Sequence, residues 1–279
     1  MSRKTIPHIV AERDNKLVML TAYDYWTSQL VDKAGADMIL VGDSLGMVMQ
    51  GHENTLGVTV DDIIYHTRAV VRGRENALIV SDMPYMSYHI SIQETIRHAG
   101  RIIQEGGSDA VKLEGGRKRL PMIEALLNAE IPVMGHLGLT PQSVNKLGGF
   151  KVQGKGLRER KELKSDALAL EDAGVFAIVL ECVPWDLAKE ISELVSIPTI
   201  GIGAGPHCDG QVLVIHDLLG MHFGFTPKFV RPFAEFGETG LDAVGNFCEA
   251  VRAGNFPSFN ESFGPRKKRP GRTLLFAEK

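Results

Sequence analysis

The chain has 279 residues, of which 44% are hydrophobic and 23% are charged, proportions typical of a globular protein. They exclude a disordered chain, a fibre and a small disulfide-stabilised domain, and the length suffices for one large α/β domain or two small ones. The 31 basic and 34 acidic side chains give a formal net charge of −3, so the overall charge does not indicate binding to nucleic acid or to an anionic membrane.

The cysteines and the first residues predict a cytoplasmic protein. Cys182, Cys208 and Cys248 are odd in number and form no CxxC pair, so we expect free thiols in a reducing compartment. Residues 1–16 are interrupted by charges and lack the apolar run of a signal peptide. No stretch of about 18 uncharged apolar residues occurs, so we expect no membrane span.

Short apolar segments alternate with longer amphipathic segments along most of the chain. The apolar segments show no clean polar alternation, which is typical of strands buried on both faces of a parallel sheet. The predicted strands span residues 17–23, 38–43, 77–83, 110–115, 131–137, 176–183, 197–203 and 211–216. The predicted helices span residues 24–34, 60–73, 92–105, 120–129, 163–173 and 187–195. This alternation predicts a (β/α)₈ barrel, with an open doubly wound sheet as the alternative.

A repeated pattern supports the barrel. Residues 34–41, 106–113 and 173–180 each combine a helix end, a glycine or small residue and the start of a strand. The strands that they begin end in Asp43, Glu114 and Glu181. Similarity among βα units explains the repeat, but it does not explain a carboxylate at each strand end.

The pattern weakens after Asp217. We expect a further helix over residues 240–253 and a single catalytic domain over residues 1–263. Residues 264–279 carry five closely spaced arginines and lysines and are predicted to form a solvated, flexible tail. The alternative for this tail is contact with an acidic partner or with nucleic acid.

Polar residues gather at the predicted strand ends, where a (β/α)₈ barrel has its active site. They are Asp43, Ser44, Asp82, Lys112, Glu114, His136 and Glu181. Three carboxylates without a His–Cys cluster favour Mg²⁺, which suits Asp43, Asp82 and Glu114. A divalent cation would also relieve the repulsion among these like charges. The alternative for each acid alone is a helix N-cap or a loop salt bridge.

Lys112 and Glu181 are further candidates for chemistry. Lys112 lies two residues from Glu114, so both side chains point the same way in a strand. It could hold a substrate carboxylate, form a Schiff base, or pair with Glu114 or Asp82. Glu181 is a candidate general base, because burial raises the pKa of a carboxyl group toward the working range. Its alternative is a structural role.

Two glycine-rich segments follow predicted strands. Residues 201–205 could bind phosphate through backbone N–H groups, but no helix that would supply a positive N-terminus is obvious there, so tight turning and close approach of a ligand explain the glycines better. Residues 148–156 are predicted to form a mobile loop that closes over the barrel mouth and excludes water. The alternative for this second segment is disorder.

Seven motifs in the expected order resemble those of the ketopantoate hydroxymethyltransferase family, and the resemblance covers about residues 3–260. The motifs span residues 18–24, 41–46, 111–115, 135–142, 180–184, 199–205 and 216–220. The resemblance implies a (β/α)₈ TIM barrel of the phosphoenolpyruvate/pyruvate-type superfamily with a C-terminal helical extension. It also implies a homo-oligomer, a decamer in several family members. The basic tail is not part of the family pattern.

The resemblance also implies an activity: transfer of a hydroxymethyl group from 5,10-methylenetetrahydrofolate to 3-methyl-2-oxobutanoate, in pantothenate biosynthesis. By resemblance, Asp43, Asp82 and Glu114 bind Mg²⁺, which stabilises an enolate of the 2-oxo acid. The implied contacts to the 2-oxo acid come from Asp43, Ser44, Asp82, Lys112 and His136. Glu181 is the implied proton acceptor. The expected partners are therefore small molecules, with no nucleic acid and no membrane.

Two other functions are compatible with the same residues. A lyase or mutase could act on a 2-oxo acid or phosphonate through a similar Mg²⁺ enolate, but such a lyase usually has a catalytic cysteine in a loop, and none follows the fourth predicted strand. A non-catalytic barrel would have no reason to keep four carboxylates at its mouth. Dependence on tetrahydrofolate distinguishes the transferase from the lyase.

Overall fold

Eight parallel strands pair in chain order and close into a barrel. The computed structural model describes residues 3–224 and 226–264. Strands β1 to β8 span Leu17–Thr21, Met38–Val41, Leu78–Asp82, Ala110–Glu114, Val133–Gly138, Ala177–Glu181, Thr199–Ile202 and Gly210–Leu213. All eight predicted strands are therefore confirmed, and the closed order excludes the open doubly wound sheet.

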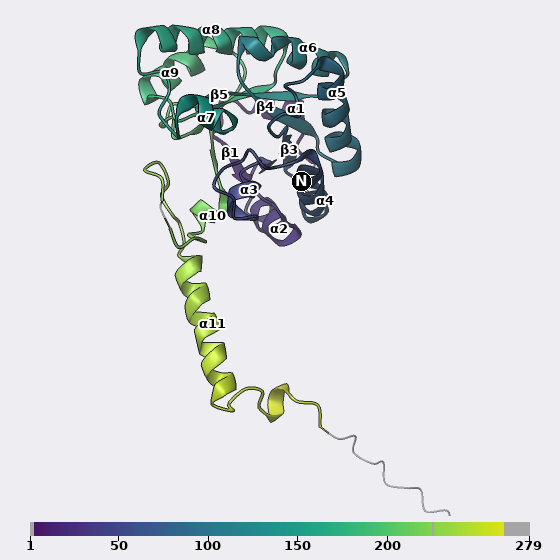
Figure 1. Cartoon of the computed structure of the whole chain (residues 1–279), viewed down its shortest axis with the longest axis vertical. Helices are drawn as coiled ribbons and strands as arrows, with labels where there is room; N and C mark the ends of the chain where they lie inside the picture. The colour runs from purple at the N-terminus through teal and green to yellow at the C-terminus, as the bar shows by residue number, and fades with distance from the viewer. Residues whose placement is uncertain (1–2, 225, 265–279) are drawn as a thin grey trace, which may run out of the picture. The chain divides into compact units, whose positions relative to one another are not determined.

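Helices lie around the outside of the strands (Figure 1). The longer ones are α2 (Tyr25–Lys33), α4 (Val60–Gly73), α5 (Ile92–Arg101), α6 (Leu120–Asn128), α8 (Leu157–Ala173) and α9 (Trp185–Leu194). These confirm the six helices predicted between strands. Shorter pieces are α1 (Ile6–Ala11), α3 (Leu45–Val48), α7 (Val144–Leu147), α10 (Ile215–Leu218), the π-helix η1 (Ile102–Gly106), and the 3₁₀ helices η2 (Arg117–Arg119) and η3 (Pro141–Ser143).

Polar side chains fix where several helices begin. The carboxylate of Asp24 accepts a hydrogen bond from the backbone N–H of Thr27 at the start of α2, and the hydroxyl of Ser91 accepts one from Glu94 at the start of α5. Such caps satisfy N–H groups that have no partner within the helix. Each helix therefore starts at a fixed distance from the strand end before it.

Alternate residues of the strands point into the barrel and form a cluster separate from the outer core. Along three strands the inward series run Leu78, Val80, Asp82; Ala110, Lys112, Glu114; and Ala177, Val179, Glu181. Ile9 of α1 is fully buried in the same inner cluster. The interior is therefore apolar for most of its depth, and it becomes polar at the carboxyl ends of the strands.

The chain divides into two compact units at Ala234. The unit after Ala234 contains α11 (Phe236–Arg252) and the 3₁₀ helix η4 (Phe259–Glu261), so the helix predicted over residues 240–253 is confirmed. The single domain expected over residues 1–263 stays a prediction, and of the tail 264–279 all but Gly264 lies outside the described residues.

The sequence also predicts free thiols and no membrane-spanning segment. Cys182, Cys208 and Cys248 are free thiols, as the sequence predicts. Of the helices in the described ranges, none combines the length and the apolar character needed to cross a membrane.

Candidate active site

One cavity of about 800 Å³ opens at the carboxyl ends of the strands. Its lining includes all seven residues that the sequence singles out at strand ends: Asp43, Ser44, Asp82, Lys112, Glu114, His136 and Glu181. The alternation of side chains along β3, β4 and β6 turns Asp82, Lys112, Glu114 and Glu181 inward. The barrel closure brings them together with His136 of β5 and with Asp43 and Ser44, which follow β2.

Glycines allow the backbone to approach closely around these groups. A Cβ atom at Gly42 would lie 2.8 Å from the Ser44 Oγ, so a larger residue there would displace the Ser44 hydroxyl. Gly138, at the end of β5, has a φ of +94°, and a Cβ atom there would lie 2.2 Å from the carbonyl oxygen of Glu181. Both positions permit a packing that other residues would prevent.

Lys112 is a buried cation held among carboxylates. Its Nζ lies 2.9 Å from Asp82 Oδ1, and Asp82 Oδ2 accepts a hydrogen bond from the backbone N–H of Asp43 at 2.9 Å. Burial lowers the pKa of Lys112, but the charges of Asp82, Glu114 and Asp43 outweigh it, so the pKa is raised overall. Lys112 is therefore protonated, which favours the ion pair over the Schiff base.

The remaining carboxyl groups are hard to ionise together. Burial, followed by the charge of Asp82, raises the pKa of Asp43 to about 7. Burial and the charge of Asp43 raise the pKa of Glu114 well above its ordinary value. Burial also raises the pKa of Glu181 to about 7, although Lys112 opposes this shift. The mouth thus holds more buried acidic groups than the buried Lys112 can neutralise.

His136 lies between Lys112 and Glu181. Burial and the neighbouring Lys112 charge hold the pKa of His136 well below its ordinary value, so the ring is neutral. Its Nδ1 lies 3.2 Å from the Lys112 ammonium and must be the acceptor, which places the proton on Nε2. Nε2 lies 3.2 Å from Glu181 Oε2. This contact is not aligned as a hydrogen bond, so His136 Nε2 is a buried polar atom without a hydrogen-bond partner among the described residues, beside the Glu181 carboxylate.

Three residues of the site were not predicted as functional. The hydroxyl of Tyr23 lies 2.8 Å from Ser44 Oγ, the side chain of Gln142 hydrogen-bonds to Asp43, and the hydroxyl of Tyr88 hydrogen-bonds to Gln142. Tyr23 and Gln142 lie within the family-like motifs at residues 18–24 and 135–142, so the motifs could have indicated them as site residues. Tyr88 lies in the loop after β3, where no pattern marked it.

Beyond the seven residues at the strand ends, the cavity is lined by apolar and aromatic side chains together with polar and charged ones. Phe150 and Val152 contribute to it from the segment 148–156, together with Phe229. This segment is tied at its end, because the backbone N–H of Gln153 donates to the carbonyl of Cys182 at 2.9 Å. Its predicted closure over the mouth stays a prediction.

The metal site that the sequence predicts is not preformed as a set of three direct ligands. Within residues 3–224 and 226–264, no group of three or more His, Cys, Asp and Glu side chains is arranged to hold a metal ion. Mg²⁺ commonly uses one or two carboxylates and completes its shell with water or substrate oxygens. The buried excess of carboxyl groups fits that kind of site.

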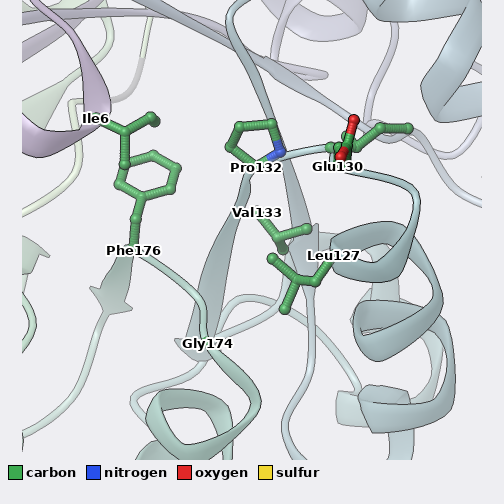
Figure 2. Close-up of a pocket in the computed structure, with 8 residues that line it drawn as sticks. Ile6, Leu127, Glu130, Pro132, Val133, Gly174 and Phe176 are labelled. Carbon is green, nitrogen blue, oxygen red and sulfur yellow. The ribbon is translucent and has the colours of Figure 1, made fainter.

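A second cavity, of about 260 Å³, lies at the opposite end of the barrel (Figure 2). Val133, the first residue of β5, and Phe176, which precedes β6, line it together with Ile6, and Glu130 is the charged residue in the lining. One carboxylate among apolar groups offers no set of residues for catalysis.

The chain is similar to proteins of one known family. The family model described as ketopantoate hydroxymethyltransferase matches residues 3–259. The 3-methyl-2-oxobutanoate hydroxymethyltransferase of Syntrophomonas wolfei subsp. wolfei is 59% identical over 252 residues, covering 90% of this chain and 91% of the relative. The protein of the same name from Moorella thermoacetica is 55% identical over 264 residues, covering 94% and 98%.

A solved structure shares the fold. The crystal structure of 2,3-dimethylmalate lyase, a member of the PEP mutase/isocitrate lyase superfamily, matches with a TM-score of 0.57 and 14% identity. The match covers 92% of this chain and 89% of the lyase. The match confirms the barrel fold that the sequence predicts.

Proposed function

The chain belongs to the ketopantoate hydroxymethyltransferase family, and we propose from this membership how its barrel mouth performs the reaction. Its activity is that of a 3-methyl-2-oxobutanoate hydroxymethyltransferase, a transferase of pantothenate biosynthesis that forms ketopantoate. It acts on small molecules, and hydroxymethyl transfer implies 5,10-methylenetetrahydrofolate as the one-carbon co-substrate.

The buried carboxyl groups of the mouth are the observation that best supports the proposal. Asp43, Asp82, Glu114 and Glu181 line one cavity, and Lys112 is the buried lysine among them. A protein gains no stability from burying like charges. Their presence is explained if the site binds a divalent cation and also needs a base.

Asp43, Asp82 and Glu114 would hold Mg²⁺, with some of these contacts made through water or substrate oxygens. When bound, Mg²⁺ supplies Lewis-acid polarisation of the 2-oxo acid, which makes the proton on C3 more acidic. Lys112 and the hydroxyl of Ser44 would bind the negatively charged end of the 2-oxo acid. Asp43 and Asp82 line the same end and fix its orientation.

Glu181 would take the proton from C3 of 3-methyl-2-oxobutanoate. A pKa of about 7 suits this role, because the carboxylate is ionised at neutral pH and is still a strong enough base. The electron pair left on C3 would then form the bond to the methylene carbon of the donor. Over the whole reaction both C–N bonds of that methylene group break, one water molecule supplies the hydroxyl oxygen, and the C3 proton and one proton of the water end on the two nitrogens of the tetrahydrofolate that leaves. His136 lies beside Glu181, with 3.2 Å between His136 Nε2 and Glu181 Oε2, and would line the pocket for the 2-oxo acid.

The one-carbon donor would bind in the outer part of the cavity. A 2-oxo acid of this size fills only the inner part of about 800 Å³. Phe150, Val152 and Phe229 provide apolar surface for a flat ring system. Segment 148–156 would cover the donor and separate the deprotonated 2-oxo acid from bulk solvent.

The alternative of a 2-oxo acid lyase or mutase loses its support. The relatives at 55–59% identity are hydroxymethyltransferases along almost their whole length. The lyase structure is only 14% identical and therefore shows the fold alone.

Two further expectations remain proposals. The family resemblance supports a homo-oligomer, specifically a decamer, which sedimentation analysis would test. A cytoplasmic location is supported by the free thiols.

The experiment that tests the proposal is an assay of ketopantoate formation with each component omitted in turn. We expect product only when 3-methyl-2-oxobutanoate, 5,10-methylenetetrahydrofolate and Mg²⁺ are all present. Full turnover after chelation of divalent metal would contradict the Mg²⁺ site. Turnover of the 2-oxo acid without folate would contradict the assignment of 5,10-methylenetetrahydrofolate as the hydroxymethyl donor.

A further inference from the structure

Gln142 is a buried amide to which the reaction above gives no role. It lies in η3, directly after β5, and is 6% exposed. Its Nε2 donates to Asp43 Oδ2 at 2.8 Å and to the carbonyl of Met83 at 3.0 Å. Its backbone N–H donates to Glu114 Oε2 at 3.1 Å. One residue therefore contacts two of the carboxylates assigned to Mg²⁺, which come from different strands.

Tyr88 determines which way the amide points. Its hydroxyl accepts a hydrogen bond from the backbone N–H of Glu114 at 3.2 Å and donates its own proton to Gln142 Oε1 at 2.6 Å. The opposite end of the amide faces two acceptors, the Asp43 carboxylate and the Met83 carbonyl. A flipped amide would direct an oxygen at both, so only one orientation satisfies every group.

A neutral donor is well suited to this position. A buried carboxylate needs hydrogen-bond donors to remain ionised, but a second cation beside Lys112 would repel Mg²⁺. The Gln142 amide supplies donors without adding charge. Gln142 hydrogen-bonds to Asp43 Oδ2 and Glu114 Oε2. It does not occupy the other carboxylate oxygens, Asp43 Oδ1 and Glu114 Oε1, which could then bind the metal ion.

We propose that Gln142 is a positioning residue that holds Asp43 and Glu114 in the orientation for binding Mg²⁺, and that Tyr88 fixes the orientation of the Gln142 amide. This inference rests on the Mg²⁺ site of the proposed function. It assigns to two loop residues a function that is separate from contact with substrate.

The test measures the Mg²⁺ dissociation constant of metal-free protein without substrates, by isothermal titration calorimetry. Gln142→Met keeps the length of the side chain and removes its polar atoms, and Tyr88→Phe removes only the hydroxyl. Ser192→Ala is the matched control, because it removes a buried hydrogen bond of 2.6 Å to Thr199, outside the residues that line the mouth cavity. Circular dichroism and the unfolding temperature show whether each variant is folded.

We expect Gln142→Met to weaken Mg²⁺ binding about 10- to 100-fold, the range for residues that orient metal ligands. Tyr88→Phe should weaken it in the same direction by a smaller factor. Ser192→Ala should lower the unfolding temperature and leave the Mg²⁺ affinity unchanged. This contrast separates a positioning role from a general loss of stability.

A folded Gln142→Met protein with the wild-type Mg²⁺ affinity would overturn the inference and leave the proposed function intact. If Gln142→Met does not fold, Tyr88→Phe decides in its place, and wild-type affinity there overturns the inference. A wild-type protein that binds no Mg²⁺ would instead overturn the metal site, and the positioning role with it.

Discussion

Asp82 has two partners, because its carboxylate pairs with Lys112 and also accepts the backbone N–H of Asp43. Its removal would leave Lys112 buried without its nearest counter-charge and would free the turn that carries Asp43. We therefore expect Asp82→Ala to weaken Mg²⁺ and the 2-oxo acid together, each by at least about tenfold. Titration calorimetry with each ligand checks this.

Asp61→Ala is the control for that change, because Asp61 is exposed and pairs with Arg101 on the outside of the barrel. It should bind both ligands as the wild type does. If Asp82→Ala kept the wild-type dependence of turnover on Mg²⁺, Asp82 would not belong to the metal site.

The pKa of Glu181 predicts how the reaction depends on pH. Burial raises this pKa to about 7, and a base works only when it has lost its proton. The rate of proton removal from C3 should therefore fall about tenfold per unit as the pH drops below 7, and level off above it. Rates measured from pH 5 to 9 at saturating Mg²⁺ test this, and a rate independent of pH between 5 and 7 would exclude a base with this pKa.

Residue by residue, the sequence predicted the groups at strand ends and missed those in loops. Asp82, Glu114 and Glu181 were predictable because each ends an apolar strand, and a barrel brings such ends together. Gln142 and Tyr88 were not, because their positions depend on how loops fold over the mouth. Their hydrogen bonds are long-range contacts that no local pattern records.

At the scale of elements, the first turn of α8 holds the end of segment 148–156, which contributes to the lining of the mouth cavity. The carboxylate of Glu159, in the first turn of α8, accepts hydrogen bonds from the backbone N–H groups of Gly154 and Lys155, both at 3.1 Å. This contact anchors the end of segment 148–156. Glu159→Ala should therefore loosen the segment and destabilise the fold by about 1–2 kcal/mol.

Steady-state kinetics distinguish this effect from general damage. For Glu159→Ala we expect a higher KM for 5,10-methylenetetrahydrofolate, with the folate-free exchange of the C3 proton unchanged. Glu162→Ala, on the same helix, removes only an exposed pair with Arg158 and should behave as the wild type. An unchanged KM in Glu159→Ala would argue against a role of this segment in folate binding.

The elements themselves were predictable where their patterns were long. The strand predicted over residues 38–43 ends at Val41, because Gly42 and Asp43 are buried like strand residues but lie in the turn. α8 begins six residues before residue 163, because its first turns are charged and show no apolar periodicity. The four-residue helices α3, α7 and α10 were missed, since a single turn is too short to show a period.

On the scale of the whole molecule, the carboxyl groups at the barrel mouth should make the stability of the folded protein depend on pH and on bound metal. The pKa values of Asp43, Glu114 and Glu181 are raised in the folded protein. Below about pH 4 the unfolded chain also holds these protons, so their contribution to stability is fully present. It is lost as the pH rises through about 7, where the folded protein must ionise buried carboxyl groups.

Mg²⁺ should reverse this loss, because it binds the ionised groups of the folded state. We expect Mg²⁺ to raise the unfolding temperature more at pH 8 than at pH 5, measured by calorimetry against protein kept in chelator. Asp43→Asn, which removes one of the titrating groups, should show a smaller difference. An equal effect of Mg²⁺ at both pH values would mean that the mouth carboxylates do not bind it.

The most direct test follows the C3 proton of 3-methyl-2-oxobutanoate in D₂O without folate, by proton NMR. The wild type with Mg²⁺ should exchange this proton, while removal of Mg²⁺ or Glu181→Gln should slow the exchange at least about 100-fold. Glu190→Gln, an exposed change on α9, should exchange at the wild-type rate. Exchange at the wild-type rate in Glu181→Gln, with the 2-oxo acid and Mg²⁺ still bound, would show that Glu181 is not the base.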